Sequence, residues 1–260
     1  MDNKGKWALV TGASGGLGAA FAALLAEQGL NLVLAARNRD KLDALAAELR
    51  SRHGVDVVSH SVDMTLAGAA PELHRAIMTQ GIALDILVNN AGQGLQGEFL
   101  ERPIETTDRM LHLNILALTD LTHAVAADMA ARGGGHILMV ASMTAFMPAP
   151  TYAAYAASKS YVRMFGEALH AELRPKNVTV TVLSPGLMDT GFLSAAGQVP
   201  SQSMKRSMIL PRLAAETGLQ ALFAGRQSVI AGRMNRLAAL VSRLLPRGVQ
   251  TRLMADALKS

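Results

Sequence analysis

The chain has 260 residues, of which half are hydrophobic and 17% are charged. This composition supports a buried core and excludes an intrinsically disordered chain. The absence of cysteine excludes a disulfide scaffold and a thiolate metal site, and we expect no metal. The first residues before Trp7 lack the apolar stretch of a signal peptide, and no run of 18 apolar residues predicts a transmembrane segment. We therefore expect a soluble, cytoplasmic protein.

The net charge of +5 is unevenly distributed along the chain. Residues 201–260 hold ten Lys and Arg against two Asp and Glu, whereas residues 1–200 hold 15 against 18. A basic balance can indicate a nucleic-acid partner. Because the basic residues are scattered and aromatic residues make up only 4% of the chain, we expect no nucleic acid to bind.

Short apolar segments bounded by turn residues alternate with Ala- and Leu-rich segments along the chain. The apolar segments predict strands at 7–10, 31–35, 56–59, 86–88, 136–141, 178–183 and 228–231. The segments between them predict helices at 16–28, 39–53, 68–80, 104–132, 153–174, 211–224 and 233–245. This alternation predicts an α/β fold: a doubly wound parallel β-sheet, Rossmann-like, with about seven strands and helices on both faces. We expect one domain over residues 1–260.

Two segments depart from the alternating pattern. Residues 186–212 lack clear periodicity and contain Gly191, Gly197 and Pro200, which predicts a substrate lid with some helix. Residues 233–260 are expected to form a C-terminal helical extension.

A glycine-rich loop follows the first predicted strand and opens a helix. Gly12 permits a tight turn, Gly16 lets the backbone approach a phosphate, and Gly18 lets the helix pack on the strand. The helix N-terminus then offers free N–H groups to an anion. The loop Gly12–Gly18, with Ser14, Gly15 and Leu17, is therefore expected to bind a pyrophosphate. The alternative is a glycine-rich turn without a ligand.

The end of the second predicted strand indicates which dinucleotide binds. An acidic residue there would hold the ribose hydroxyls of NAD, but the sequence places Arg37 and Asn38 at this point. Because a guanidinium can pair with a 2′-phosphate, we expect NADP as the cofactor, with NAD as the alternative. In the other interpretation Arg37 is a solvated surface charge.

Three further residues form a candidate catalytic set. Tyr155 and Lys159 are four residues apart on a predicted helix and so share one face. An ammonium beside a phenol favours the phenolate, so we expect Lys159 to lower the pKa of Tyr155. Ser142 follows a predicted strand, where its hydroxyl could orient a substrate carbonyl.

Together these motifs resemble the short-chain dehydrogenase/reductase family over residues 5 to about 232. The matching residues, in family order and spacing, are Gly12, Gly16, Gly18, Asp63, the run Asn89-Asn90-Ala91-Gly92, Asn114, Ser142, Tyr155, Lys159, Pro185, Gly186 and Thr190. Finer features, such as Ala36-Arg37-Asn38-Arg39, resemble the branch with steroid-type and long-chain ketoacyl-type reductases.

The resemblance implies a role for each matching residue. Tyr155 would donate and accept the proton, Ser142 would hold the reacting oxygen, and Lys159 would also grip the nicotinamide ribose. Asn114 would keep a proton-relay water beside Lys159. The remaining positions would contact the cofactor: Asp63 with its neighbour Met64, Asn90, Ala91 and Gly92 on the adenosine side, and Pro185, Gly186 and Thr190 on the nicotinamide side. For Asp63 a role as a helix cap is the alternative.

The predicted function is an NADP-dependent oxidoreductase that transfers hydride between nicotinamide and a secondary alcohol or ketone of a mainly apolar small molecule. The alternatives are a reductase of 3-oxoacyl thioesters, which the basic C-terminal segment would suit, and a non-catalytic dinucleotide-sensing protein. The family resemblance and the apolar helices 104–132 and 153–174 also predict a homodimer or homotetramer.

The last predicted helix is amphipathic. At 100° per residue, one arc holds Met234, Leu237, Ala238, Val241, Leu244 and Leu245. The opposite side holds Arg233, Arg236, Arg243 and Arg247, with Leu240 as the one apolar residue among them. Such a helix can pack on its own domain or a sister subunit, on another protein, or on an anionic membrane surface. Because the segment has no Trp or Phe anchor, we expect it to pack on its own domain or a sister subunit.

Overall fold

The computed structural model describes residues 4–259, so the first three residues and the last lie outside it. Seven parallel strands form one sheet in the order β3-β2-β1-β4-β5-β6-β7, which confirms the predicted fold class. The strands are β1 (Trp7–Thr11), β2 (Asn31–Ala36), β3 (Val57–Ser61), β4 (Leu84–Asn89), β5 (Gly135–Val140), β6 (Val178–Ser184) and β7 (Ser228–Ile230).

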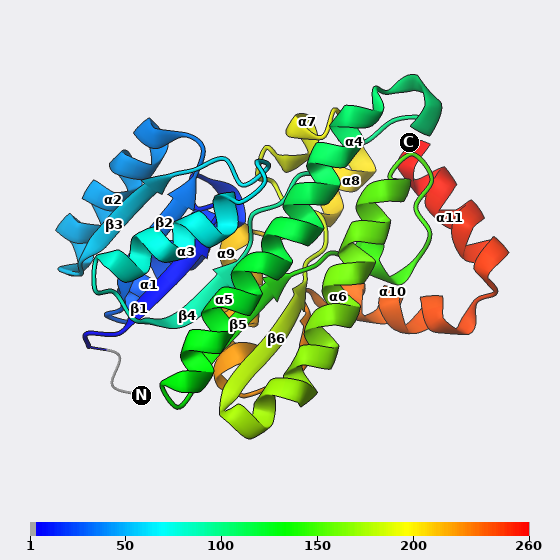
Figure 1. The fold of residues 1–260 in the computed structure, drawn as a ribbon. Helices are drawn as coiled ribbons and strands as arrows, with labels where there is room; N and C mark the ends of the chain where they lie inside the picture. The colour runs from blue at the N-terminus through cyan, green and yellow to red at the C-terminus, as the bar shows by residue number, and fades with distance from the viewer. Residues whose placement is uncertain (1–3, 260) are drawn as a thin grey trace.

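Helices cover both faces of this sheet (Figure 1). One face packs against α1 (Gly16–Glu27), α2 (Arg39–His53) and α9 (Pro211–Phe223). The other packs against α3 (Ala69–Thr79), α5 (Leu118–Ala131) and α6 (Ala153–Leu173). Strand geometry explains the division, because successive side chains point to opposite faces. Ala8 and Val10 of β1 belong to the first layer, and Leu9 belongs to the second.

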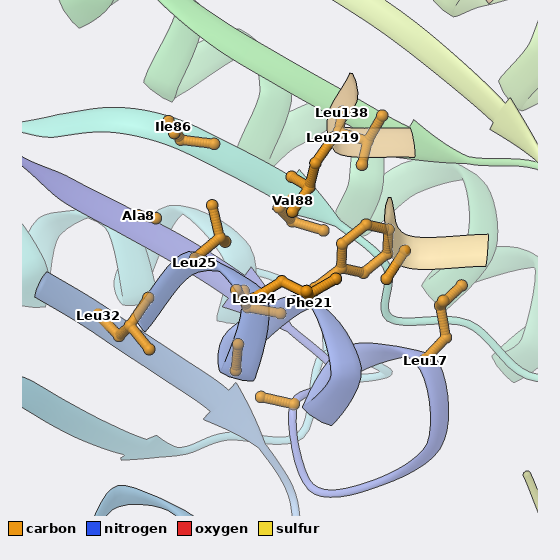
Figure 2. Close-up of a cluster of buried hydrophobic side chains, with 14 of the residues drawn as sticks. Ala8, Leu17, Phe21, Leu24, Leu25, Leu32, Ile86, Val88, Leu138 and Leu219 are labelled. Carbon is orange, nitrogen blue, oxygen red and sulfur yellow. The ribbon is translucent and has the colours of Figure 1, made fainter. Parts of the chain in front are cut away.

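The core beneath α1 consists of aliphatic side chains around one phenyl ring. Phe21 is fully buried and lies with Leu17, Leu24 and Leu25 of α1 against the sheet (Figure 2). Burial of a side chain of this size contributes roughly 1.5–3 kcal/mol to the free energy of unfolding. The packing therefore fixes the start of α1, and with it the glycine loop, against the end of β1.

The segment predicted as one helix at 104–132 is interrupted. It consists of α4 (Ile104–Leu111), a π-helical turn (His112–Ala117) and α5. A π-turn inside a helix often marks a functional site, and this one carries the fully buried Asn114. Length and composition alone make Ile104–Ala131 the one candidate membrane span among the described residues. Its packing on the sheet through Leu121, Val125 and Met129 accounts for that apolar composition.

The connections and the C-terminal part contain shorter elements. The segment predicted as a lid contains α7 (Phe192–Ala195) and α8 (Gln202–Ser207). After β7 the chain forms α10 (Arg233–Leu244) and α11 (Arg247–Lys259), here called the C-terminal arm. The remaining short turns of helix are η1 (Phe99–Glu101), η3 (Met143–Phe146) and η4 (Arg174–Lys176).

The apolar arc of α10 is not covered by its own domain, in contrast to one of the packings we expected. Leu244 is 81% exposed and Met234 76% exposed, whereas Ala239 and Ser242 are the buried residues of this helix. The small side chains allow α10 to lie close to the domain. The large apolar ones therefore point away from it.

Candidate active site

A single cavity of about 880 Å³ lies at the carboxyl ends of the strands. The order of the strands reverses between β1 and β4, and ligands of open α/β sheets bind outside the carboxyl ends at such a point. The cavity is lined by Gly12, Ser14, Gly15, Gly16, Leu17, Gly18, Arg37, Asn38, Asp63, Met64, Asn90, Ala91, Gly92, Ser142, Tyr155, Lys159, Pro185, Gly186 and Thr190. These are all the predicted site residues except Asn114.

The glycine loop has the geometry expected of a phosphate cradle. Gly12 and Gly16 have φ of 67° and 55°, a region that favours glycine. A side chain at Gly16 would come within 2.9 Å of Thr190, and one at Gly18 would collide with the backbone of Gly12. No side chain caps α1 at Gly15, so its first N–H groups are available to an anion. A dinucleotide pyrophosphate fits this loop.

Hydrogen bonds connect the glycine loop to the end of β4. The Asn90 amide donates to the carbonyl oxygens of Thr11 and Gly12 over 2.9 and 3.3 Å. The Thr11 hydroxyl accepts from the backbone N–H groups of Asn90 and Ala91 over 3.0 and 2.9 Å. Asn90 therefore holds two walls of the cavity together in addition to lining it.

The ends of β2 and β3 form the far wall of the cavity. Arg37 is exposed at this wall, and the side chain of Asn38 accepts a hydrogen bond from the Lys41 backbone N–H to cap α2. Burial alone would raise the pKa of Asp63, but hydrogen bonds from Thr65 and the nearby charge of Arg37 hold that pKa below its usual value. The alternative of Asp63 as a helix cap is wrong, because α3 begins at Ala69 and its cap is Gly68.

Ser142, Tyr155 and Lys159 all line the cavity. Ser142 follows β5, whereas Tyr155 and Lys159 lie one turn apart on α6, both less than a tenth exposed. The Ser142 side chain lies close enough to the Tyr155 hydroxyl to lower the Tyr155 pKa. The Lys159 ammonium donates to the Val140 carbonyl oxygen over 2.9 Å and lies 6.0 Å from the centre of the Tyr155 ring.

Burial is the main cause of the pKa shifts of Tyr155 and Lys159, and the shift of Tyr155 is opposite to the expected direction. Burial raises the pKa of Tyr155 to about 12, and the interaction with Ser142 offsets this only in part. It also lowers the pKa of Lys159 to about 8. The net shift of the Tyr155 pKa is therefore upward, opposite to the expected direction, because desolvation of the phenolate is the larger effect.

Asn114 lies behind the cavity wall rather than in it. Its side chain accepts from the Gln93 N–H over 2.9 Å and donates to the Gln93 carbonyl and the Ser158 hydroxyl, both over 3.0 Å. A side chain at Gly92 would come within 3.2 Å of the Lys159 nitrogen and 3.3 Å of the Asn114 oxygen. Asn114 thus holds the loop after β4 close to Lys159. The implied role in keeping a relay water stays a prediction.

The segment after β6 forms the remaining wall on the predicted nicotinamide side. The Pro185 carbonyl accepts from the Met143 N–H over 3.0 Å, which places this segment beside Ser142. A side chain at Gly186 would collide with Asn235 of α10. The C-terminal arm therefore packs directly on this wall.

Tyr152 and Gln198 line the cavity and were not predicted, whereas the apolar lid residues Met188, Phe192 and Met204 line it as expected. The Tyr152 hydroxyl donates to the Gln198 side chain over 2.7 Å, and both residues are buried. Tyr152 precedes Tyr155 by one helical turn, a spacing that could have indicated it. The remaining wall is mostly apolar and comes from the end of η3, from the lid and from α11: Met147, Phe192, Leu193, Met204, Met254, Ala257 and Leu258.

Comparison with known proteins agrees with this geometry. Residues 6–199 match the family model of short chain dehydrogenases. This chain belongs to the short-chain dehydrogenase family. The match covers the sheet from β1 to β6 and every predicted site residue, so it confirms the resemblance noted from the motifs.

Relatives and solved structures show the range within the family. The very-long-chain 3-oxoacyl-CoA reductase of Pyrenophora tritici-repentis is 31% identical over 84% of this chain and 66% of its own length. A short-chain dehydrogenase of Sphingobium yanoikuyae, solved in complex with NADPH, has a TM-score of 0.82 and 30% identity over 92% and 93% of the two chains. A 7β-hydroxysteroid dehydrogenase has a TM-score of 0.88 and 26% identity over 97% of each chain. The chain thus spans about two thirds of the curated relative.

Proposed function

We propose that this protein is an NADPH-dependent reductase of bulky, mainly apolar ketones. One observation carries the proposal: the glycine cradle, the Ser142–Tyr155–Lys159 cluster and an apolar wall line one continuous cavity. A bound nicotinamide dinucleotide would supply the hydride, and the chain would supply position, proton and electrostatics.

The cofactor half of the cavity favours NADP. Arg37 and Lys41 both line it near the end of β2, where a ribose 2′-phosphate would lie. A guanidinium there forms charge-assisted hydrogen bonds with a phosphate. The NADPH in the solved Sphingobium yanoikuyae enzyme supports the same choice.

The catalytic cluster supports proton transfer to a carbonyl oxygen. With a pKa of about 12, Tyr155 is protonated at neutral pH and is ready to donate its proton. The Ser142 hydroxyl, which lies close to that of Tyr155, would hold the same oxygen. Lys159 would bind the nicotinamide ribose.

The substrate half of the cavity favours an apolar molecule. Phe192 lies with its ring centre 5.7 Å from that of Tyr155, and methionines and leucines of the lid and of α11 extend this wall. Tyr152 and Gln198 satisfy each other by a hydrogen bond and so add little net polarity. The hydroxysteroid dehydrogenase among the solved structures is named for such a substrate.

A second candidate function is the reduction of 3-oxoacyl thioesters. The basic C-terminal segment would attract an acidic carrier, and one curated relative is named as a 3-oxoacyl-CoA reductase.

The test is NADPH oxidation by the purified protein with simple ketones, steroid ketones and 3-oxoacyl thioesters. The proposal predicts the highest kcat/KM for a bulky apolar ketone. A clear preference for a thioester would favour the second candidate. Tight NADPH binding without turnover of any substrate would support a dinucleotide-sensing protein instead.

A further inference from the structure

The outer surface of α10 consists of large apolar side chains that the described part of the chain leaves uncovered. Exposed fractions are 76% for Met234, 54% for Leu237, 59% for Leu240, 45% for Val241 and 81% for Leu244. Exposing such a row to water is unfavourable at about 25 cal/mol per Å² of apolar surface. Contiguous exposed apolar surface of this kind marks an interaction site.

The orientation of α10 is fixed by contacts on its other side. Ala239 and Ser242 are buried, and the Asn235 amide donates to the Ala231 carbonyl over 2.7 Å. The buried Gln250 side chain of α11 donates to the carbonyl oxygens of Ser242 and Leu245 over 2.7 and 2.8 Å. The arm is therefore held with its small and polar face inward. The apolar face has to meet something outside the domain.

The charge of the C-terminal arm indicates which kind of surface the apolar face of α10 binds. Arg233, Arg236, Arg243, Arg247 and Arg252 are exposed, and the sequence has no acidic residue from 217 to 255. Within residues 4–259, none of these arginines forms an ion pair. Basic side chains beside an exposed apolar face are the pattern of a helix that lies in the surface of an anionic bilayer.

A second copy of the chain is the less favourable occupant. A two-fold pairing of α10 with α10 would bring arginines toward arginines, with no acidic residue in either helix to compensate. A bilayer with acidic headgroups complements both the charge and the apolar face.

We propose that α10 binds the surface of an anionic lipid bilayer, with its apolar arc at the boundary between headgroups and acyl chains. No aromatic residue follows Phe223, so the helix lacks the usual interfacial anchors. Attraction of the arginines to the headgroups therefore dominates the affinity. Binding is reversible and weakens as salt concentration rises.

The arm also forms part of the candidate active site. Met254 and Leu258 of α11 line the apolar end of the cavity, and Asn235 of α10 packs against Gly186. An apolar ketone dissolved in the bilayer would meet the protein at the arm that walls its cavity. This consequence rests on the proposed function, whereas lipid binding does not.

The test is co-sedimentation of the full-length protein with vesicles, without substrate or cofactor. Vesicles of phosphatidylcholine are compared with vesicles that also contain phosphatidylglycerol. The proposal predicts sedimentation with the anionic vesicles, release at high salt, and at least about a tenfold weaker partition for the Arg243→Glu/Leu244→Glu variant.

The matched control is Arg75→Glu/Met78→Glu on α3, which makes the same charge change and also places Glu at an exposed apolar position. This control should bind as the unchanged protein does. Circular dichroism melting checks that both variants fold; should the α10 variant melt early, Leu237→Ser/Val241→Ser repeats the comparison without a charge change.

Three results would overturn the proposal. In the first, the unchanged protein does not sediment with anionic vesicles at all. In the second, the folded α10 variant binds these vesicles as well as the unchanged protein does. In the third, the α3 control loses as much vesicle binding as the α10 variant. A smaller oligomer for the α10 variant in light scattering, without vesicle binding by the unchanged protein, would assign the face to a second copy.

Discussion

Two buried side chains that line the cavity have pKa values moved in opposite directions by the same cause. Desolvation disfavours the charged form, so the pKa of Tyr155 rises to about 12 and that of Lys159 falls to about 8. Tyr155 thereby stays a proton donor through the neutral range. Lys159 is the group whose charge changes near working pH.

Lys159 should therefore limit cofactor use at high pH. Its amine is charged below a pKa of about 8 and neutral above it, and the neutral form binds the nicotinamide ribose less well. We expect kcat/KM for NADPH to fall as pH rises through about 8. The measurement is the pH profile of NADPH oxidation at saturating ketone. Lys159→Met should give a low and flat profile, and a flat profile for the unchanged protein would contradict this assignment.

Arg37 should decide between the two dinucleotides. If its guanidinium pairs with the 2′-phosphate, Arg37→Asp should weaken NADPH binding by about 2–3 kcal/mol and leave NADH binding nearly unchanged. Fluorescence titration with both cofactors measures this. Arg39→Asp is the control, because Arg39 is exposed and does not line the cavity. An equal loss of affinity for NADPH and NADH would show that Arg37 does not bind the 2′-phosphate.

At the scale of elements, local pattern was enough to predict most of the sheet and the glycine loop. Short apolar runs that end in turn residues specify buried parallel strands. The spacing of Gly12, Gly16 and Gly18 is typical of a dinucleotide-binding turn between a strand and a helix. The order of the elements then brings the strand ends together. The predicted cofactor residues consequently line one cavity.

Other features depend on tertiary packing and have no local signal. The π-turn around Asn114 breaks a segment whose composition is uniformly helical. The Tyr152–Gln198 hydrogen bond joins residues 46 apart in the sequence. The direction of the Tyr155 pKa shift follows from burial, which the Tyr–Lys spacing does not reveal.

The helix α11 should contribute to substrate binding rather than to cofactor binding. Leu258 faces the apolar end of the cavity, and Leu253 on the opposite side of the helix is 53% exposed. We expect Leu258→Asp to raise KM for an apolar ketone about tenfold, with NADPH affinity unchanged, because it places a charge against the substrate. Leu253→Asp is the matched control and should have no effect in steady-state kinetics. Equal effects of the two changes would mean that α11 acts only on stability.

At the scale of the whole molecule, the sequence pattern predicted the amphipathic helix but not the direction of its apolar face. The arc from Met234 to Leu244 is consistent with packing on the domain. The structure instead buries Ala239 and Ser242, because small side chains permit the close approach of α10. A helical wheel identifies an apolar face and does not say which surface covers it.

A second exposed apolar region lies on the helices predicted to form an oligomer. Leu116 at the π-turn is 53% exposed and Met164 on α6 is 60% exposed. We propose that these helices form the interface of a homodimer or homotetramer. Light scattering at micromolar concentration should show an oligomer, and Leu116→Asp/Met164→Asp should reduce its size. A monomeric unchanged protein would contradict this proposal.

The central claim is that Tyr155 donates the proton in an NADPH-dependent ketone reduction within the cavity. Tyr155→Phe removes the hydroxyl and keeps the ring that packs against Phe192. The direct measurement is kcat for reduction of an apolar ketone together with the Kd of NADPH for this variant. We expect an unchanged Kd and a kcat lower by about a hundredfold or more. A variant that retains its turnover would contradict this claim and require another proton donor.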